Sequence, residues 1–523
     1  GLQVFERIRK ADAIYVDKTD MIYNIVSDAR MQFFISRPRR FGKTLLCWTL
    51  NALFSGKREL FEGLAIAKTD WEWESYPVIH LDMSKVCTDE GSAGVRRSLA
   101  FQMKCAANEH EVDLDADMGA GEMLTKIIIE TAKKHGKPAV VIVDEYDKPF
   151  LDFYNKPPMA EEVRGIMRGC YSQLKSNEPH IRFLFMTGIS KFTKAGVFST
   201  LNNLNDLSLD SKFGALLGYT EKELVGYFAE HLEAGAEKLK ISVDELVDRL
   251  RRYYNGFCFD GSQRVYCPFS VLNFFSDCRL LNYWMDSGGT RVIAEYMKGR
   301  NLTVEQFRGM PVSMNFVFSP GEIESTPPEG FLYQAGYLTL REGGDDYFLL
   351  DYPNTEVLDS MSELVTRNMV QSGGGEFMNF RTSLIDALTE DDCELFIETI
   401  NRLLASIPYD DYISAMKQGR RLKITAQEWL YRSTILAFLR GCGVLTFGEM
   451  HSNQGRSDLI VTCRGVTWVL EIKVAKNNDC AEQALEAMKQ INDNQYAAAY
   501  PNAKKVGIAI DDGTRQIGEW IEA

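Results

Sequence analysis

Short apolar runs that predict strands alternate with helical patterns between about residues 30 and 210. MQFFIS is followed by the helical pattern TLLCWTLNALF, and YPVIHLDM is followed by a helix near residues 93–107. Two further apolar runs, AVVIV and IRFLFMTG, complete the series. This alternation is typical of a parallel sheet covered by helices. We therefore expect an α/β domain over residues 1–215.

The pattern changes after this domain and again towards the end of the chain. Residues 216–300 have a helical pattern that opens with a capping box of Thr220 and Glu223, so we expect a helical lid there. Over residues 301–415 we expect a connector, in which the hairpin GYLTLREGGDDYFLL, with Gly343 and Gly344 at its turn, interrupts helices. Residues 416–523 return to a helix-hairpin-helix-strand order, which predicts a second α/β domain.

The segment GRSDLIVTCRGVTWVLEIKV, residues 455–474, predicts a hairpin with an unusual pair of acids. If residues 464–465 form a two-residue turn, counting outward places Asp458 directly opposite Glu471. Opposed like charges destabilise an antiparallel pair. The apolar residues of the second strand share one face, so Asp458, Glu471 and Lys473 share the other. A divalent metal that neutralises the two carboxylates explains this register.

These residues match the needs of phosphodiester cleavage. Mg²⁺ takes oxygen ligands and keeps several waters, so Asp458 and Glu471 with a substrate phosphate suffice to bind it. Lys473 would then stabilise the developing negative charge. Glu428, on the preceding helical pattern TAQEWLYRSTILAFLRGCG, either supplies a third carboxylate or lies on the polar face of that helix. The alternative for the hairpin is an exposed ion pair of Lys473 with nearby acids at an empty site.

The segment RPRRFGKT lies between the predicted strand MQFFIS and a predicted helix, which is the context of a phosphate-binding loop. In that role Gly42 lets the backbone approach the phosphates, Lys43 reaches the β- and γ-phosphate oxygens, and Thr44 ligates Mg²⁺ at the helix N-terminus. The usual GxxxxGK[ST] pattern has a glycine where this chain has Arg37. That glycine accommodates a tight turn, so Arg37 leaves the shape of the loop open.

Two more strand ends strengthen the prediction of a nucleotide site. The run AVVIVDEYD ends its strand at Asp144 and Glu145, which could hold the Mg²⁺ shell and activate the attacking water. The strand IRFLFMTG ends near Thr187, a candidate polar sensor of the γ-phosphate. Arg39 and Arg40 are either clamps on phosphate oxygens or solvated surface charges. The competing interpretation is that FGKT only caps a helix and that DE is a solvated strand end.

Composition narrows the class of protein. The chain has 523 residues, of which 45% are hydrophobic and 25% charged, as in soluble globular proteins. No run approaches the ~18 apolar residues of a spanning helix, and no secretory signal pattern opens the chain, so we expect a cytoplasmic protein without a membrane partner. A net charge of -14 argues against a protein coated for nonspecific nucleic-acid binding. The 11 cysteines show no CxxC spacing, so neither a zinc site nor a disulfide framework is expected.

Taken together, the motifs resemble a bacterial family that pairs an AAA-ATPase-like domain with a C-terminal PD-(D/E)XK nuclease-superfamily domain. The resemblance rests on YVDKT, RPRRFGKT, VDEYDKP and TGISKF, then on YNGFCF, VYCPFSVLNFF and FLYQAGYLT, and finally on GRSDLIV, LEIKV and QALEAMKQI. It implies an N-terminal P-loop NTPase sheet, a helical or winged-helix-like middle region and a restriction-endonuclease-like C-terminal domain. Ser457 stands where the proline of the superfamily name is expected, and RPRRFGKT is similar to the form that this family uses.

The resemblance implies roles for the same residues. It implies nucleotide binding by the RPRRFGKT loop, metal binding by Asp458 and Glu471, and catalysis by Lys473. We therefore expect ATP and Mg²⁺ as cofactors and nucleic acid, with DNA favoured, as the partner. We expect the ATP to be hydrolysed, and a homo-oligomer is compatible with an AAA-type domain.

A second hypothesis is a nucleotide-switched module whose inactive nuclease-like domain only binds nucleic acid or protein. Residues 441–523 contain 8 Lys plus Arg against 11 Asp plus Glu, so no basic groove is visible in their composition, which favours this alternative. The retention of Asp458, Glu471 and Lys473 favours a working nuclease instead.

Overall fold

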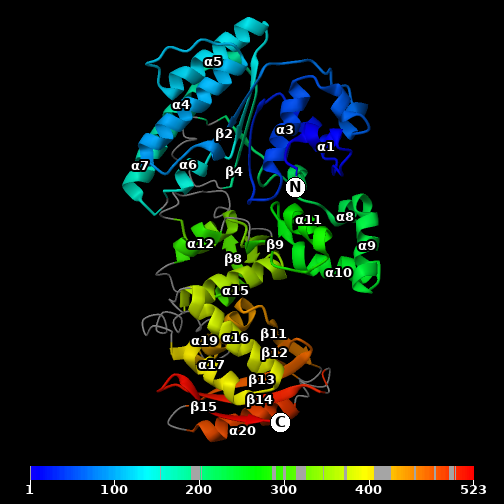
Figure 1. The fold of residues 1–523 in the computed structure, drawn as a ribbon, viewed down its shortest axis with the longest axis vertical. Helices are drawn as coiled ribbons and strands as arrows, with labels where there is room; N and C mark the ends of the chain where they lie inside the picture. The colour runs from blue at the N-terminus through cyan, green and yellow to red at the C-terminus, as the bar shows by residue number, and fades with distance from the viewer. Residues whose placement is uncertain are drawn as a thin grey trace. The chain divides into compact units, whose positions relative to one another are not determined.

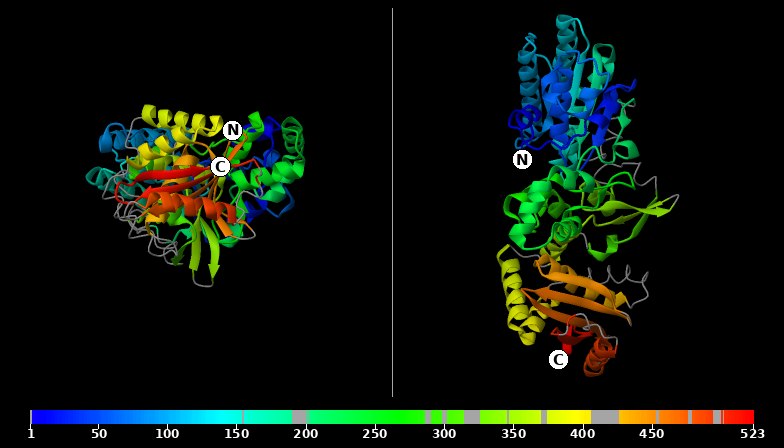
Figure 2. Two further views of the ribbon diagram at one scale, coloured as in Figure 1. Left: turned by 90° about the horizontal axis from the view of Figure 1, so that it is seen from below. Right: turned by 90° about the vertical axis from the view of Figure 1, so that its right-hand side faces the viewer.

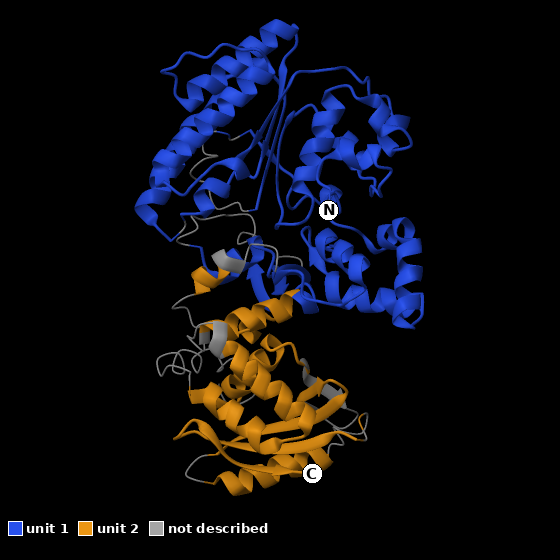
Figure 3. Ribbon diagram, in the orientation of Figure 1, with its two compact units in different colours: residues 1–292, 309–356 blue, residues 293–308, 357–523 orange. Residues whose placement is uncertain are grey.

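The computed structural model describes residues 2–153, 155–189, 201, 203–285, 290–297, 302–313, 326–344, 347–369, 374–405, 426–452, 455–475, 479–493, 500 and 502–523. For residues 290–292, 369, 374–376, 426, 445, 447–452 and 455–458 it describes the backbone alone. The chain forms two compact units (Figure 3). Unit 1 contains residues 1–292 and 309–356, and unit 2 contains residues 293–308 and 357–523. The four ranges expected from the sequence stay predictions.

A five-stranded sheet lies at the centre of the first part of unit 1 (Figure 1). Its strands are β1 (Gln32–Ser36), β2 (Val78–Asp82), β3 (Ala139–Asp144), β4 (Ile181–Gly188) and β5 (Asn205–Asp206). They lie in the order β2-β3-β4-β1-β5, and all neighbours are parallel, which confirms the predicted parallel sheet. β3 is buried along its whole length, as its unbroken apolar run requires. Because β4 lies between β1 and β3, the three strand ends that carry the predicted motifs are neighbours.

Helices cover both faces of this sheet (Figure 1). On one face α4 (Gly91–Glu109), α5 (Ala120–His135) and α7 (Pro157–Ser176) pack together and share a core with β2 and β3. On the other face α3 (Lys43–Phe54) packs against β2, β3 and β4. The shorter helices here are α1 (Phe5–Lys10), α2 (Thr19–Val26) and α6 (Lys148–Leu151). The helices predicted after MQFFIS and YPVIHLDM are therefore α3 and α4.

The helical region predicted after residue 215 belongs to unit 1. Its helices are α8 (Glu221–Tyr227), α9 (Ala229–Leu239), α10 (Val243–Tyr254) and α11 (Pro268–Asp277). They enclose a core of their own that includes Leu224, Leu250 and Phe274. The predicted capping box begins α8, because the Glu223 amide donates to Thr220 Oγ1 at 3.2 Å and the Thr220 amide donates to Glu223 Oε2 at 2.7 Å. The helical middle region is thereby confirmed.

Two small antiparallel sheets follow in unit 1. One pairs β6 (Phe257–Cys258) with β7 (Arg264–Val265), and the other has the order β8-β10-β9, from β8 (Met310–Ser313), β9 (Thr339–Gly344) and β10 (Tyr347–Asp351). α14 (Pro328–Gln334) precedes β9. The sequence pattern places the hairpin turn at Gly343 and Gly344, but β9 continues through Gly344. A register shift beside Tyr347 lets Gly344 pair with Tyr347, so both glycines belong to the strand and the predicted turn position is wrong.

Unit 2 contains a mixed five-stranded sheet in the order β11-β12-β13-β14-β15. Its strands are β11 (Leu445–Ser452), β12 (Gly455–Cys463), β13 (Val466–Ala475), β14 (Lys504–Asp511) and β15 (Gln516–Glu522). β13 and β14 are parallel, and the other neighbours are antiparallel. α20 (Cys480–Asp493) connects the two parallel strands and packs on one face of the sheet. This order confirms the second α/β domain.

The opposite face of this sheet is covered by α16 (Gly374–Glu390), α17 (Cys393–Ala405) and α19 (Ala426–Gly441). Figure 2 shows α16 and α17 in yellow and α20 in orange-red on opposite sides of the strands. Trp468 and Leu470 of β13 lie in the larger core, as predicted, whereas Val469 packs with Met488 and Ile491 of α20. Both faces of β13 are therefore buried, although the sequence pattern assigned only one face to the core.

Two further helices, α12 (Thr290–Met297) and α15 (Thr355–Met369), each contain a boundary between the units. Throughout the described ranges, the helices are too short or too polar to cross a membrane. All 11 cysteines are free thiols in the structure, and most of them are buried.

Candidate functional site

The first candidate site lies where β1 leads into α3. Gly42, the residue before α3, has a φ of +95°, which glycine adopts without steric cost. No side chain caps the start of this helix, and Thr44, its second residue, is partly exposed. Lys43 is 4% exposed, and its Nζ donates to the carbonyl oxygens of Arg37 and Pro38 at 3.0 Å each. The loop therefore holds an ammonium group at a helix N-terminus, which suits a bound phosphate.

Arg37 occupies the position at which a glycine is usual. It is not in the left-handed region, so the backbone of this loop does not need glycine there. Arg37 is 1% exposed, and its guanidinium donates to the carbonyl oxygens of Ser36 at 2.9 Å, Ser208 at 2.8 Å and Phe213 at 3.3 Å. It also lies 4.2 Å from the ring centroid of Phe259, and burial lowers its pKa to about 10. Arg37 is thus a structural tie between the loop and later segments of unit 1.

The acids at the end of β3 lie beside the end of β4. Asp144 is 1% exposed, and its Oδ1 accepts a hydrogen bond from Thr187 Oγ1 at 2.5 Å. The same hydroxyl oxygen accepts from the backbone N–H of Glu145 at 3.3 Å. Glu145 has a φ of +50°, which turns the chain at the end of the strand. The sequence predicts Asp144 and Glu145 at the end of one strand and Thr187 near the end of another. The structure brings these three residues together.

Charged groups interact across this edge of the sheet. Burial lowers the pKa of Lys43, and Glu145 opposes that shift. Burial raises the pKa of Glu145, whereas Lys43 and, more weakly, Arg39 lower it. Arg40 is exposed, and its guanidinium lies 4.7 Å from the ring centroid of Phe269 in α11. Lys43, Glu145 and Arg39 thus form one electrostatic group, whereas Arg40 stacks on the helical region.

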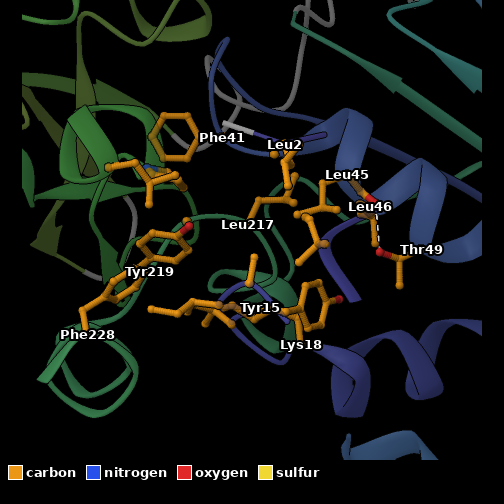
Figure 4. Close-up of a pocket in the computed structure, with 18 of the residues that line it drawn as sticks. Leu2, Tyr15, Lys18, Phe41, Leu45, Leu46, Thr49, Leu217, Tyr219 and Phe228 are labelled. Carbon is orange, nitrogen blue, oxygen red and sulfur yellow. Dashed lines mark hydrogen bonds between the residues drawn. The ribbon is translucent and has the colours of Figure 1, made fainter. Parts of the chain in front are cut away.

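A cavity of about 600 Å³ adjoins Gly42 (Figure 4). Tyr219 and Phe228 lie on one side of it and Leu45 of α3 on another, while the segment 12–18 also lines it. Most of the lining side chains are apolar. Sequence reasoning missed this cavity because its walls come from segments far apart in the chain. The motif YVDKT, which ends the lining segment, is the signal that could have indicated it.

The second candidate site lies on the predicted hairpin of unit 2. β12 and β13 pair in the predicted register from the turn at residues 464–465 out to Leu459 opposite Leu470. Both turn residues have a positive φ, as this kind of two-residue turn requires. One residue further out, the same register places Asp458 opposite Glu471. The backbone of Asp458 belongs to β12, but its side chain lies outside the described residues.

Three of the predicted residues of this site come together. Glu471 is 1% exposed in β13, and Lys473 Nζ lies 3.3 Å from Glu471 Oε1. The same Nζ lies 4.0 Å from Oε1 of Glu428, which α19 positions. The side chains of Lys473 and Glu428 are only 18% and 21% exposed, so this ion-pair group is largely buried. Carboxylate oxygens beside an ammonium group provide the hard oxygen donors that Mg²⁺ prefers.

Among the residues whose side chains are described, no three His, Cys, Asp or Glu side chains form a metal-binding cluster. The hairpin site therefore rests on Glu471 and Glu428 together with the undescribed Asp458 side chain.

Comparison with known proteins matches both parts of the chain. A family model described as a predicted AAA-ATPase matches residues 1–198, and the PD-(D/E)XK nuclease superfamily model matches residues 426–520. An uncharacterized protein in the vnfD 5′ region of Azotobacter chroococcum mcd 1 is 31% identical over 512 residues, which cover 96% of this chain and 93% of that protein.

Among solved structures, Cdc6p from Pyrobaculum aerophilum is similar over 67% of this chain and 92% of its own. The identity is 9% and the TM-score is 0.25. The match to the Azotobacter protein, in contrast, spans almost the whole of both chains. This chain therefore belongs to the family that pairs a predicted N-terminal AAA-ATPase domain with a C-terminal PD-(D/E)XK nuclease-superfamily domain.

Proposed function

We propose that unit 1 binds ATP with Mg²⁺ and hydrolyses it. The observation that carries this proposal is the meeting of Lys43, Asp144, Glu145 and Thr187 at the carboxyl edge of the sheet, beside the start of α3. Parallel sheets bind ligands at this edge. In this assignment the phosphates lie against Gly42 and the first turn of α3. Lys43 then exchanges its loop carbonyls for phosphate oxygens, while Asp144 and Thr187 stay hydrogen-bonded.

Each remaining group at this edge has a role in the proposal. Thr44 and Asp144 would hold Mg²⁺, which neutralises phosphate charge when bound. Glu145 would accept a proton from the attacking water, and its raised pKa makes it a stronger base than an exposed glutamate. Arg39, which interacts electrostatically with Glu145, would clamp a phosphate oxygen. The apolar cavity beside Gly42 would take the base of the nucleotide.

For unit 2 we propose metal-dependent cleavage of phosphodiester bonds in nucleic acid, with DNA favoured. Asp458 and Glu471 would hold Mg²⁺, which supplies Lewis acidity and a water of lowered pKa when bound. Lys473 would stabilise the negative charge that develops on the phosphate. Glu428 lies close enough to Lys473 to orient its ammonium group. The largely buried position of Lys473 supports this role, because charge stabilisation is stronger where water is excluded.

We further propose that nucleotide binding in unit 1 controls the nuclease site through α15. The boundary between the units falls inside this helix, after Glu356. Glu356 is fully buried and accepts hydrogen bonds from Ser270 Oγ at 2.8 Å and from the backbone N–H of Trp284 at 2.9 Å. Further along α15, Thr366 Oγ1 lies 2.8 Å from the Ser362 carbonyl oxygen of its own helix and 3.2 Å from the Ala437 carbonyl oxygen of α19, and its one hydrogen is shared between these acceptors. α15 is thus hydrogen-bonded to residues of unit 1 at its start. Further along, it contacts α19, the helix that positions Glu428.

The test of this proposal compares ATP turnover and cleavage of labelled DNA in the wild type and in Lys43→Ala. The matched control is Lys57→Ala, which removes a half-exposed lysine that pairs with Glu6. We expect Lys43→Ala to lose ATP turnover by at least roughly 100-fold and to abolish the effect of ATP on cleavage. Undiminished turnover would contradict the nucleotide site, whereas an unchanged effect of ATP on cleavage would contradict the coupling.

A second candidate function is a nucleotide-switched binding module with an inactive nuclease-like domain. The observation that favours it is the position of Lys473 between Glu471 and Glu428, since two carboxylates around one ammonium group form a stable cluster without a metal. This candidate predicts that ATP binds and that neither Mg²⁺ nor Mn²⁺ supports cleavage of any nucleic acid.

A further inference from the structure

The motif YVDKT, residues 15–19, has no role in the proposed chemistry, yet its charged residues are held firmly. It connects α1 to α2, and Tyr15, Val16 and Lys18 line the cavity beside Gly42. Lys18 is 7% exposed, which is unusual for a lysine. A buried charge needs a specific partner, and this one has three acceptor atoms, which belong to Glu223 and Ala215.

Lys18 joins the motif to the start of the helical region. Its Nζ donates to Glu223 Oε1 at 2.6 Å, to Glu223 Oε2 at 2.7 Å and to the Ala215 carbonyl at 2.7 Å. Glu223 is the third residue of α8 and also closes the capping box with Thr220. The ion pair therefore fixes the first turn of α8 directly to the segment before the sheet.

The neighbours of Lys18 attach the same motif to the α/β part of unit 1. Asp17 Oδ2 accepts from the Ala65 amide at 2.7 Å, and Asp17 Oδ1 accepts from the amide and hydroxyl of Thr19 at 2.9 and 2.7 Å. Thr19 Oγ1 in turn accepts from the Ile66 amide at 3.0 Å. These hydrogen bonds fix the motif to residues 65–66. Lys18 can therefore hold the start of α8 in a fixed position.

The walls of the cavity lie on either side of this ion pair. The segment 12–18 supplies one wall, and Leu217, Tyr219 and Phe228, which flank or end α8, supply another. Figure 4 shows Lys18 beside Tyr15, at the edge of the space that these side chains surround. A ligand in the cavity therefore contacts both of the segments that Lys18 and Glu223 connect.

We propose that Lys18 and Glu223 form a positioning clasp, which holds the start of α8 and thereby the cavity-lining residues before and after this helix, and so sets the affinity of unit 1 for nucleotide. This inference rests on the proposed function of unit 1 and assigns the YVDKT motif to positioning rather than chemistry. Neither residue touches the phosphate edge formed by Lys43 and Asp144 in the contacts of the structure. Loss of the clasp should therefore weaken binding and leave the rate of hydrolysis at saturating ATP nearly unchanged.

The test uses the full chain with Lys18→Met, Glu223→Gln and the double variant. Glu223→Gln keeps an acceptor for the Thr220 amide and removes only the charge, so it remains informative if Lys18→Met does not fold. The matched control is Glu221→Gln, a substitution on the same helix as Glu223. It breaks the exposed ion pair between Glu221 and Arg251 of α10. Two readouts are measured: the Kd and KM for ATP, and amide hydrogen exchange over residues 221–239 without nucleotide.

We expect each clasp variant to raise the Kd and KM for ATP at least tenfold, with kcat within twofold of the wild type. The double variant should lose no more than the worse single variant, because both remove one interaction. Exchange in residues 221–239 should be faster in the clasp variants and unchanged in Glu221→Gln.

Two different failures can be told apart. If the wild type binds no ATP, the proposed function of unit 1 is wrong, and the exchange readout still supports or overturns the clasp. If the wild type binds ATP and folded clasp variants match it in Kd and in exchange, the clasp is wrong and the nucleotide site stands.

Discussion

Thr187 Oγ1 donates to Oδ1 of Asp144 at 2.5 Å, so the end of β4 fixes the carboxylate at the end of β3. The same hydroxyl oxygen accepts a hydrogen bond from the Glu145 amide. The Thr187 hydroxyl therefore uses its donor and one acceptor position within the protein. From its place at a strand end, Thr187 is predicted to be a sensor of the γ-phosphate. The geometry gives it a second role, because any ligand of Asp144 is positioned through this hydrogen bond.

Thr187→Val should therefore act through Asp144. Valine keeps the shape of threonine and removes the hydrogen bond, which is worth about 1.5–3 kcal/mol when one partner is charged. We expect the Mg²⁺ concentration needed for half-maximal ATP turnover to rise about tenfold or more, and Thr187→Ser to restore it. Titration of Mg²⁺ at saturating ATP measures this, and a valine variant with the wild-type Mg²⁺ dependence would exclude the positioning role.

Glu145→Gln should retain ATP binding and lose turnover by at least roughly 100-fold, as expected for a general base. Burial raises the pKa of Glu145, so wild-type turnover should increase with pH through a pKa above 4.5, and the variant should lack this acidic limb. Equal turnover in both proteins would remove Glu145 from the mechanism.

The raised pKa of Glu145 also means that its charged carboxylate destabilises the fold at high pH. Glu145→Gln should therefore raise the melting temperature at pH 8 more than at pH 4.5.

Arg37→Ala should destabilise unit 1, although it places a small residue where the usual pattern of such loops has a glycine. It removes the guanidinium donor from the carbonyl oxygens of Ser208 and Phe213, of which the second keeps the Leu216 amide as a donor, and it opens a void beside Phe259, at a cost of about 3 kcal/mol. Arg40→Ala, which removes an exposed stacking contact, should cost less than about 1 kcal/mol. Urea unfolding of both variants measures the difference, and equal losses would refute the structural role of Arg37.

The sequence predicted the elements well because its apolar runs match the periods of real strands and helices. The register of the β12-β13 hairpin followed from one two-residue turn at residues 464–465, since a turn fixes every pair beyond it. Burial of the second face of β13 was missed. Val469 lies on that face and was a signal, but the pattern alone does not show that α20 covers it.

The parts of the nucleotide site that depend on long-range contacts could not be predicted. Arg37 looked like a defect in the loop because its acceptors, at Ser208 and Phe213, lie more than a hundred residues away in the chain. The clasp between Lys18 and Glu223 was hidden for the same reason, although each residue belongs to a local motif that the sequence displays.

Cleavage of nucleic acid by unit 2 tests most directly whether both units are working catalysts. Labelled single- and double-stranded DNA and RNA are incubated with Mg²⁺ or Mn²⁺, with and without ATP. Wild type is compared with Lys473→Ala and with Lys489→Ala, which removes an exposed lysine of α20 as a control. We expect cleavage that requires the metal, disappears in Lys473→Ala and persists in Lys489→Ala. Absence of cleavage of every substrate in a wild-type protein that binds ATP would contradict the account and leave the nucleotide-switched binding module.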